Sequence, residues 1–257
     1  MDKKTKFITI CSGKGGVGKS FVAANLANLL SEKGNTLLWD SNLNFPNLHL
    51  ILGVDPPLRL NDYINSNIKL KDTIYNVKPS FDLIIDSPLS DREDKEHSEK
   101  FYEIYQEIAS LNTYDFVIID TMPGAGEIVL ESCILSDLSI VLITDEPTTI
   151  GDSYGLLKLI LPFVDSEKIS LLVNNVIDEE DYDEISMKIN LTTNKFLGVN
   201  FNTLGFIPYD REVRISIQKQ DLITNSYKNL PVSKNLHDIC YRIEEYLKSK
   251  NLINENR

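Results

Sequence analysis

The chain has 257 residues, of which 42% are apolar and 25% are charged, as in an ordinary globular protein. Its 38 acidic residues outnumber 26 basic ones, and the formal net charge is -12. This excess argues against broad, sequence-independent binding of nucleic acid and against adsorption on an anionic membrane by charge alone. No window approaches the roughly 18 apolar residues of a membrane span.

The cysteines predict an ordinary reduced protein. Cys11, Cys133 and Cys240 are odd in number and far apart in the chain, so they form neither a disulfide framework nor a zinc ribbon. The basic N-terminus has no long apolar stretch and does not resemble a signal peptide. We therefore expect reduced, packed thiols and a cytoplasmic protein.

Short apolar runs alternate with helical patterns along the whole chain. Strands are predicted at residues 7–11, 36–40, 81–88, 116–120, 138–144, 169–176 and 203–208, and helices at 22–34, 95–111, 128–135, 154–164, 182–195 and 236–250. Gly34 is expected to supply the C-cap of the first helix. Several strands are continuously apolar, which is typical of a parallel sheet buried on both faces.

These elements predict an α/β fold with a single doubly wound, mostly parallel sheet of about seven to eight strands and helices on both faces. Residues 1–250 would form this domain, and 251–257 a polar C-terminal tail that frays.

The segment between the first predicted strand and helix carries a phosphate-binding motif. Residues 13–20 read GKGGVGKS and match G-x-x-x-x-G-K-[ST] at every fixed position. Glycines let backbone N–H groups surround phosphate oxygens, and the helix directs its positive end at the same anion. The nucleotide-binding candidates are Gly13, Lys14, Gly15, Gly16, Val17, Gly18, Lys19, Ser20 and Phe21. Lys19 would reach the β- and γ-phosphates of ATP, and Ser20 would ligate Mg²⁺.

This loop resembles the deviant Walker A motif of the MinD/ParA family of P-loop ATPases, whose extra lysine is Lys14 here. The resemblance implies that Lys14 crosses the interface of an ATP-dependent homodimer and contacts the partner's ATP, so that nucleotide binding is coupled to dimerisation. The alternative is a solvated loop lysine.

Further positions match the same family. Asp40 corresponds to the first aspartate of its D-x-D pair, and Asp120 to its Walker B aspartate. The resemblance implies a Mg²⁺ site at Ser20, Asp40 and Asp120, with Lys14, Lys19 and Asp40 in the catalytic group. It also implies that Asn174 and the backbone near Pro208 hold the adenine of ATP or ADP, with Asn175 as the competing candidate for Asn174.

The stretch from Thr144 to Tyr154 resembles the T-P-E-P-T-[ST]-I-x-D-[AS]-Y signature of the FlhG (FleN) branch. This resemblance implies a regulator of flagellar number or placement with flagellar or cell-pole protein partners. The net charge of -12 and the lack of a basic C-terminal patch argue against nucleic acid as a partner. A peripheral position at the inner membrane or cell pole stays open. The apolar stripe in residues 236–250 favours a helix packed on the sheet over a membrane anchor. Only six residues precede Phe7, so the branch's N-terminal extension, which stimulates the GTPase FlhF, is not expected.

One departure concerns hydrolysis. Asn42 stands where the second aspartate of D-x-D orients the attacking water. An amide keeps the shape of a carboxylate but loses its charge and one acceptor oxygen. We therefore expect ATP binding with slow or absent hydrolysis. The alternatives are a non-hydrolysing ATP-bound module and another positioning or partitioning ATPase of the MinD/ParA type.

Overall fold

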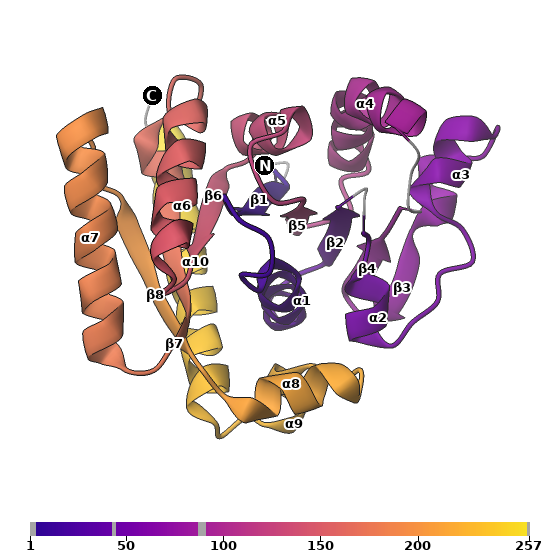
Figure 1. Ribbon diagram of the computed structural model, residues 1–257. Coiled ribbons are helices and arrows are strands. Elements are labelled where there is room, and N and C mark those ends of the chain that lie inside the picture. The colour runs from indigo at the N-terminus through magenta and orange to yellow at the C-terminus, as the bar shows by residue number, and fades with distance from the viewer. Residues whose placement is uncertain (1–3, 43–44, 87–90, 256–257) are drawn as a thin grey trace.

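The computed structural model describes residues 4–42, 45–86 and 91–255, with 91–99 and 251–255 described by their backbone alone. In chain order its elements are β1 (Lys6–Cys11), α1 (Lys19–Leu30), β2 (Thr36–Ser41), α2 (Leu48–Leu52), α3 (Leu60–Asn65), η1 (Leu70–Thr73), β3 (Tyr75–Lys78), β4 (Phe81–Ile84), α4 (Asp91–Ser110), β5 (Phe116–Thr121), α5 (Glu127–Leu135), β6 (Leu138–Ile143), α6 (Pro147–Ile160), η2 (Ser166–Lys168), β7 (Ile169–Val176), α7 (Glu179–Leu197), β8 (Asn202–Pro208), α8 (Arg211–Gln218), α9 (Ile223–Ser226) and α10 (Pro231–Glu255) (Figure 1).

The described strands form a single sheet in the order β3-β4-β2-β5-β1-β6-β7-β8. All neighbours are parallel except β3 and β4, which pair antiparallel at one edge. Every residue of β1, β2 and β6 is buried, because helices cover both faces of the sheet. The structure confirms the predicted doubly wound α/β sheet.

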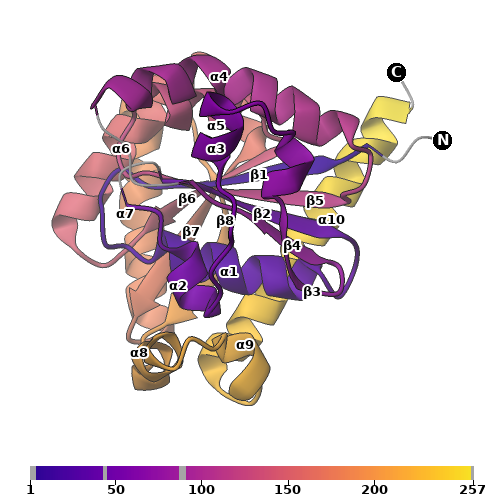
Figure 2. The same cartoon turned by 90° about the vertical axis from the view of Figure 1, so that its right-hand side faces the viewer.

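Two layers of helices enclose the sheet. Figure 2 shows α4 and α5 above the sheet and α1 below it. One buried cluster joins α1 and α10 to the lower face, and two others lie under α3 to α7. Because the central strands are covered on both sides, polar groups of the sheet can meet water only at the ends of the strands.

The last helix, α10, packs on the sheet as its apolar stripe predicts. Its buried side chains lie against β8 and α1 and include Leu236, Ile239, Ile243 and Leu247. The helix runs past the predicted end at Lys250 through residue 255, and residues 256–257 of the predicted tail lie outside the described part. No helix within the described residues is long and apolar enough to cross a membrane.

The boundaries of several elements differ from the predictions. Helix α1 ends at Leu30, four residues before Gly34, so the prediction that Gly34 caps this helix is wrong. A Cβ at residue 34 would lie 2.3 Å from Oδ2 of Asp115, and this close approach requires the glycine. Strand β4 ends at Ile84, and residues 87–88 of the predicted strand lie outside the described residues.

Candidate nucleotide-binding site

The phosphate-binding loop joins the carboxyl end of β1 to the first turn of α1. Gly16 and Gly18 have φ angles of 80° and 96°, in the left-handed region that favours glycine. A Cβ on Gly18 would lie 2.4 Å from Nδ2 of Asn174, and one on Gly13 would lie 2.3 Å from the backbone carbonyl of Asp152. The glycines thus allow both the backbone conformation and the close packing of the loop.

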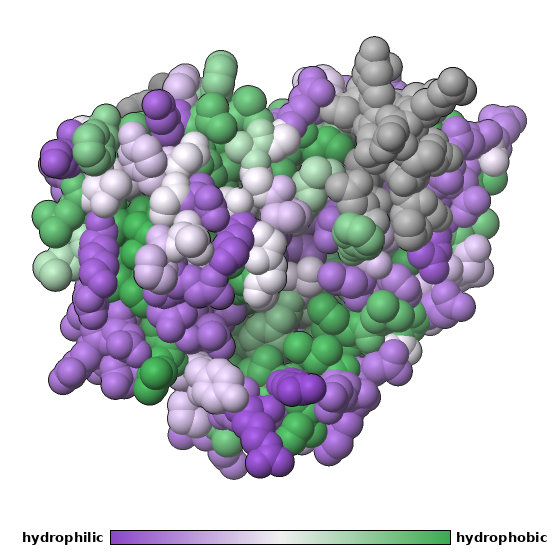
Figure 3. Space-filling view, viewed as in Figure 1, coloured by the Kyte–Doolittle hydropathy of each residue, from purple (hydrophilic) through white to green (hydrophobic). Residues whose placement is uncertain are grey.

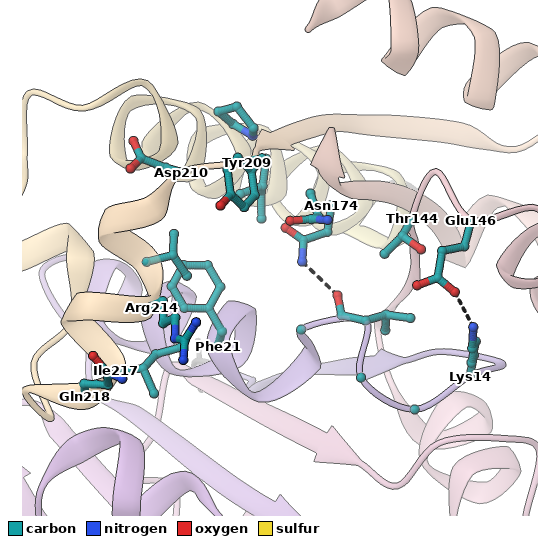
Figure 4. Close-up of a pocket in the computed structure, with 18 residues that line it drawn as sticks. Lys14, Phe21, Thr144, Glu146, Asn174, Tyr209, Asp210, Arg214, Ile217 and Gln218 are labelled. Carbon is teal, nitrogen blue, oxygen red and sulfur yellow. Dashed lines mark hydrogen bonds and ion pairs between the residues drawn. The ribbon is translucent and has the colours of Figure 1, made fainter. Parts of the chain in front are cut away.

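Asn174, near the end of β7, holds this loop in place. Its Nδ2 donates a hydrogen bond of 2.8 Å to the carbonyl oxygen of Val17 (Figure 4). Sequence reasoning predicts Asn174 at the adenine, and the structure places the side chain at the border between the loop and the cavity beside it. The competing candidate, Asn175, also lines this cavity and has a φ of 65°.

Lys19 is buried beneath the loop. Its Nζ donates a hydrogen bond of 2.9 Å to Oγ of Ser12, the residue that follows β1. Burial lowers the pKa of Lys19, although attraction to Asp120 opposes this shift. A phosphate oxygen bound in the loop would supply a second negative partner for the ammonium group and would stabilise its charged form.

Two fully buried aspartates lie next to each other at the ends of neighbouring strands. Asp40 on β2 pairs in register with Asp120 on β5. Burial raises the pKa of Asp40, and repulsion from Asp120 raises it further. Burial also raises the pKa of Asp120, against the opposing effects of the Ser20 hydroxyl and the Lys19 ammonium group.

The two carboxylates differ in their hydrogen bonds. Asp40 accepts three backbone N–H groups, from Asn42 at 3.1 Å, Asn47 at 2.9 Å and Leu48 at 3.0 Å. Within the described residues neither oxygen of Asp120 has a hydrogen-bond partner, although Ser20 lies close enough to lower its pKa. Asp40 therefore anchors the segment that follows β2, whereas Asp120 keeps its oxygens available.

The available oxygens of Asp120 and the hydroxyl of Ser20 fit a Mg²⁺ ion. Mg²⁺ commonly takes one or two protein oxygens and completes its shell with phosphate oxygens and water. The described part of the chain holds no group of three His, Cys, Asp or Glu side chains able to bind a metal by themselves. A Mg²⁺ ion here would therefore arrive with the nucleotide, held by Ser20 and Asp120.

Lys14 forms contacts within its own chain. Its Nζ lies in an ion pair with Glu146 (Figure 4). The same Nζ donates a hydrogen bond of 3.1 Å to Oγ1 of Thr148. Both partners lie at the start of α6, and the ion pair is exposed to solvent. Exposed ion pairs contribute little to stability, so this contact can exchange for another anion at low cost.

A cavity of about 450 Å³ opens beside the loop. Figure 3 shows the corresponding apolar hollow between α1 and α8. Of the predicted residues, Phe21, Asn174, Pro208 and loop residues 14–18 line it, and the opposite wall comes from α8 and the two residues before it: Tyr209, Asp210, Val213, Arg214, Ile217 and Gln218. Sequence reasoning assigned this wall no part in nucleotide binding, because neither the short helix α8 nor the two residues before it carry a phosphate-binding pattern.

Asn42 directs its amide into its own loop. Its Nδ2 donates a hydrogen bond of 3.1 Å to the carbonyl of Phe45. In the described structure Asn42 thus belongs to the segment that Asp40 anchors.

Comparisons with known proteins agree with this geometry. The CobQ/CobB/MinD/ParA nucleotide-binding domain model matches residues 8–223. Antiactivator FleN of Pseudomonas aeruginosa is 27% identical over 93% of this chain and 86% of its own length. Flagellum site-determining protein YlxH of Helicobacter pylori is 32% identical over 60% of this chain and 53% of its own length.

Solved structures show the same fold. The septum site-determining protein MinD of Pyrococcus horikoshii, complexed with Mg-ADP, superposes with a TM-score of 0.77 at 22% identity, over 93% of this chain and 96% of that one. The loop, the paired aspartates and the family match lead to one conclusion: the chain belongs to the CobQ/CobB/MinD/ParA family of nucleotide-binding domains, with relatives in the FleN branch.

Proposed function

We propose that this chain is a MgATP-binding switch protein that dimerises with ATP and regulates the number or placement of flagella. The observation that carries the proposal is the glycine loop, which lines the cavity, together with the buried Lys19 ammonium group and the nearby carboxylate of Asp120, whose oxygens have no hydrogen-bond partner among the described residues. The similarity to FleN and YlxH supports the flagellar role.

The site suggests how a nucleotide would lie. Its phosphates would contact the loop N–H groups and Lys19, and its base would enter the apolar hollow beside Phe21 and Ile217. Mg²⁺ bound at Ser20 and Asp120 would neutralise phosphate charge. The chain's own residues would hold the phosphates and exclude water from the loop.

ATP-dependent dimerisation would use Lys14. In the proposed switch its ammonium group leaves Glu146 and Thr148 and contacts the phosphates of the partner's ATP. Because the exposed pair in cis is weak, two triphosphates brought face to face would compete successfully for the lysine. The net charge of -12 favours protein partners over nucleic acid or an anionic membrane surface.

Hydrolysis would be slow, because the position expected to orient water carries the amide of Asn42, whose Nδ2 is engaged with Phe45. A second function, a non-hydrolysing ATP-bound module, rests on the same observation. Single-turnover hydrolysis of labelled ATP distinguishes the two: measurable release of phosphate supports the slow switch, and none over many hours supports the module.

Calorimetric titration with MgADP tests the nucleotide site. We expect binding by the wild-type chain and a loss of at least about 100-fold in affinity for Lys19→Ala, because the ammonium group meets the phosphates directly. Lys188→Ala is the matched control, since this lysine is exposed on α7 and lies outside the cavity. Equal affinity of the two variants would refute the assignment of Lys19.

Flagellar counting tests the cellular role separately. In cells of the source organism that lack the gene, we expect an altered number or position of flagella, restored by the wild-type chain and not by Lys19→Ala. An unchanged flagellar pattern in the deletion strain would contradict the regulatory role and leave the nucleotide site unaffected.

A further inference from the structure

Two cysteines that lie far apart in the sequence meet beside the phosphate-binding loop. Cys11 ends β1, Cys133 lies in α5, and their sulfur atoms are 3.8 Å apart. Both are fully buried in the cluster between the sheet and α5 and α6. Both thiols are free, and the separation is close enough that a modest approach would bring the sulfurs to the roughly 2.05 Å of a disulfide.

The pair lies directly behind the nucleotide site. Cys11 precedes Ser12, whose hydroxyl accepts a hydrogen bond from Lys19 and donates one of 2.7 Å to the carbonyl of Lys14. The carbonyl of Ser12 accepts a hydrogen bond of 2.9 Å from the N–H of Gly124, in the segment between Asp120 and α5. A shift of Cys11 toward α5 would therefore move the residue that ties the loop, Lys19 and this segment together.

We propose that Cys11 and Cys133 are a site of oxidative modification, where a hydroperoxide forms an intramolecular disulfide that ties α5 to β1, and that nucleotide bound at the loop slows this reaction. Contacts with Cys11 and with the neighbouring Ser139 and Ser132 lower the pKa of the Cys133 thiol, although burial opposes this shift, and a lowered pKa favours the thiolate form that reacts with peroxides.

The chemistry balances with hydrogen peroxide as the oxidant. The sulfur of Cys133 attacks one peroxide oxygen, the O–O bond breaks, and the departing oxygen takes a proton and leaves as water, so that a sulfenic acid remains. The sulfur of Cys11 then attacks the sulfenic sulfur, and the hydroxyl leaves as a second water with the thiol proton. Two thiols are oxidised, and one peroxide is reduced to two waters.

Because the pair is completely buried, its oxidation requires a movement that bound nucleotide would oppose. Peroxide can reach the sulfurs only when α5 moves away from the sheet, since neither thiol is exposed. A nucleotide that fixes the loop, Ser12 and Gly124 would oppose this movement, and the disulfide would in turn oppose closure of the loop. This second half rests on the proposed nucleotide function, whereas formation of the disulfide does not.

The test treats the full chain with hydrogen peroxide, counts thiols after denaturation and maps linked peptides by mass spectrometry. The chain has three cysteines, and we expect the count to fall to one, with Cys11 joined to Cys133 and Cys240 left free. Cys133→Ala is the control and should keep its remaining thiols unlinked. Retention of all three thiols, overoxidation without a bond, or linkage through Cys240 would overturn the proposal.

The same reaction is then timed with saturating MgADP. We expect disulfide formation to slow about fivefold or more, within the usual range of coupling between two sites. Equal rates in a chain that calorimetry shows to be loaded would overturn the coupling. Should MgADP fail to bind, the proposed function fails instead, and the count without nucleotide still decides whether the pair forms the bond.

Discussion

Two aspartates at adjacent positions of neighbouring strands have opposite surroundings. The carboxylate of Asp40 accepts hydrogen bonds from three backbone N–H groups. The carboxylate oxygens of Asp120 have no hydrogen-bond partner among the described residues. Buried polar groups are normally satisfied, so an unsatisfied carboxylate indicates a ligand that completes it. The sequence places both aspartates at the site, but only the structure distinguishes the anchoring Asp40 from the available Asp120.

The first prediction concerns the stability of the chain without nucleotide. Burial raises the pKa of Asp120, so the folded state holds this proton more tightly than the unfolded state. Stability therefore falls as pH rises from the ordinary aspartate pKa through the raised one. We expect Asp120→Asn to increase the free energy of unfolding by roughly 1 kcal/mol at pH 7.5, which corresponds to a rise in Tm of about 2–4 °C. The same variant should abolish the effect of Mg²⁺ on nucleotide affinity.

Calorimetric melting at several pH values, with Asp40→Asn as a matched variant, checks this prediction. The difference in Tm between Asp120→Asn and wild type should shrink below the raised pKa of Asp120, where the wild-type carboxyl is also neutral. Asp40→Asn should lower Tm instead, because its NH₂ group would face backbone N–H donors. A lower Tm for Asp120→Asn at pH 7.5 would refute this account of its burial.

A second prediction concerns Asn42. Replacing its amide by a carboxylate in Asn42→Asp would restore an acceptor pair able to orient water and should raise single-turnover hydrolysis by about tenfold or more. Affinity for MgADP should stay within about threefold, because Asn42 is not among the residues lining the cavity. An unchanged rate would remove Asn42 from the explanation of slow turnover.

Several contacts at the start of α1 fix the conformation of the phosphate loop. Gly18 is the N-cap residue of α1, in the left-handed conformation and packed against Asn174 from β7. Asn174 in turn holds Val17. The helix start, the loop and the end of β7 are therefore fixed together, and the positive end of α1 is directed at the phosphate position.

Two glycine variants distinguish the cost of a left-handed backbone conformation from the cost of a steric contact with Asn174. Both Gly16→Ala and Gly18→Ala would place a Cβ on a left-handed residue, at a cost of about 1–2 kcal/mol. Only Gly18→Ala also meets Nδ2 of Asn174, whereas nothing lies within 4 Å of a Cβ on Gly16. We expect the larger loss of Tm and of MgADP affinity for Gly18→Ala, and equal losses would contradict the role of the Asn174 contact.

The elements differ in how well the sequence predicts them. Continuous apolar runs and the glycine motif identify the central strands and the phosphate loop, because burial on both faces and phosphate binding each restrict residue type locally. Strand β3 was missed, because an edge strand of four partly exposed residues needs no apolar pattern. The wall from α8 and the meeting of Cys11 with Cys133 depend on tertiary packing, which no local pattern encodes.

At the scale of the whole molecule, the negative net charge contrasts with the positive charge of the phosphate loop. The chain carries a net charge of -12, yet its phosphate loop presents Lys14 and Lys19 at the carboxyl end of the sheet. An acidic protein resists association with copies of itself through self-repulsion. Bound triphosphate facing a partner's Lys14 would offset this repulsion, and dimerisation would then follow the nucleotide.

The mass of the chain in solution with MgATP, MgADP and no nucleotide tests this central claim most directly. We predict a dimer with MgATP alone, and a monomer with MgADP or without nucleotide. Lys14→Ala should stay monomeric with MgATP while calorimetry still shows the nucleotide bound. A wild-type chain that binds MgATP and remains a monomer, or a Lys14→Ala variant that dimerises as the wild type does, would contradict the account.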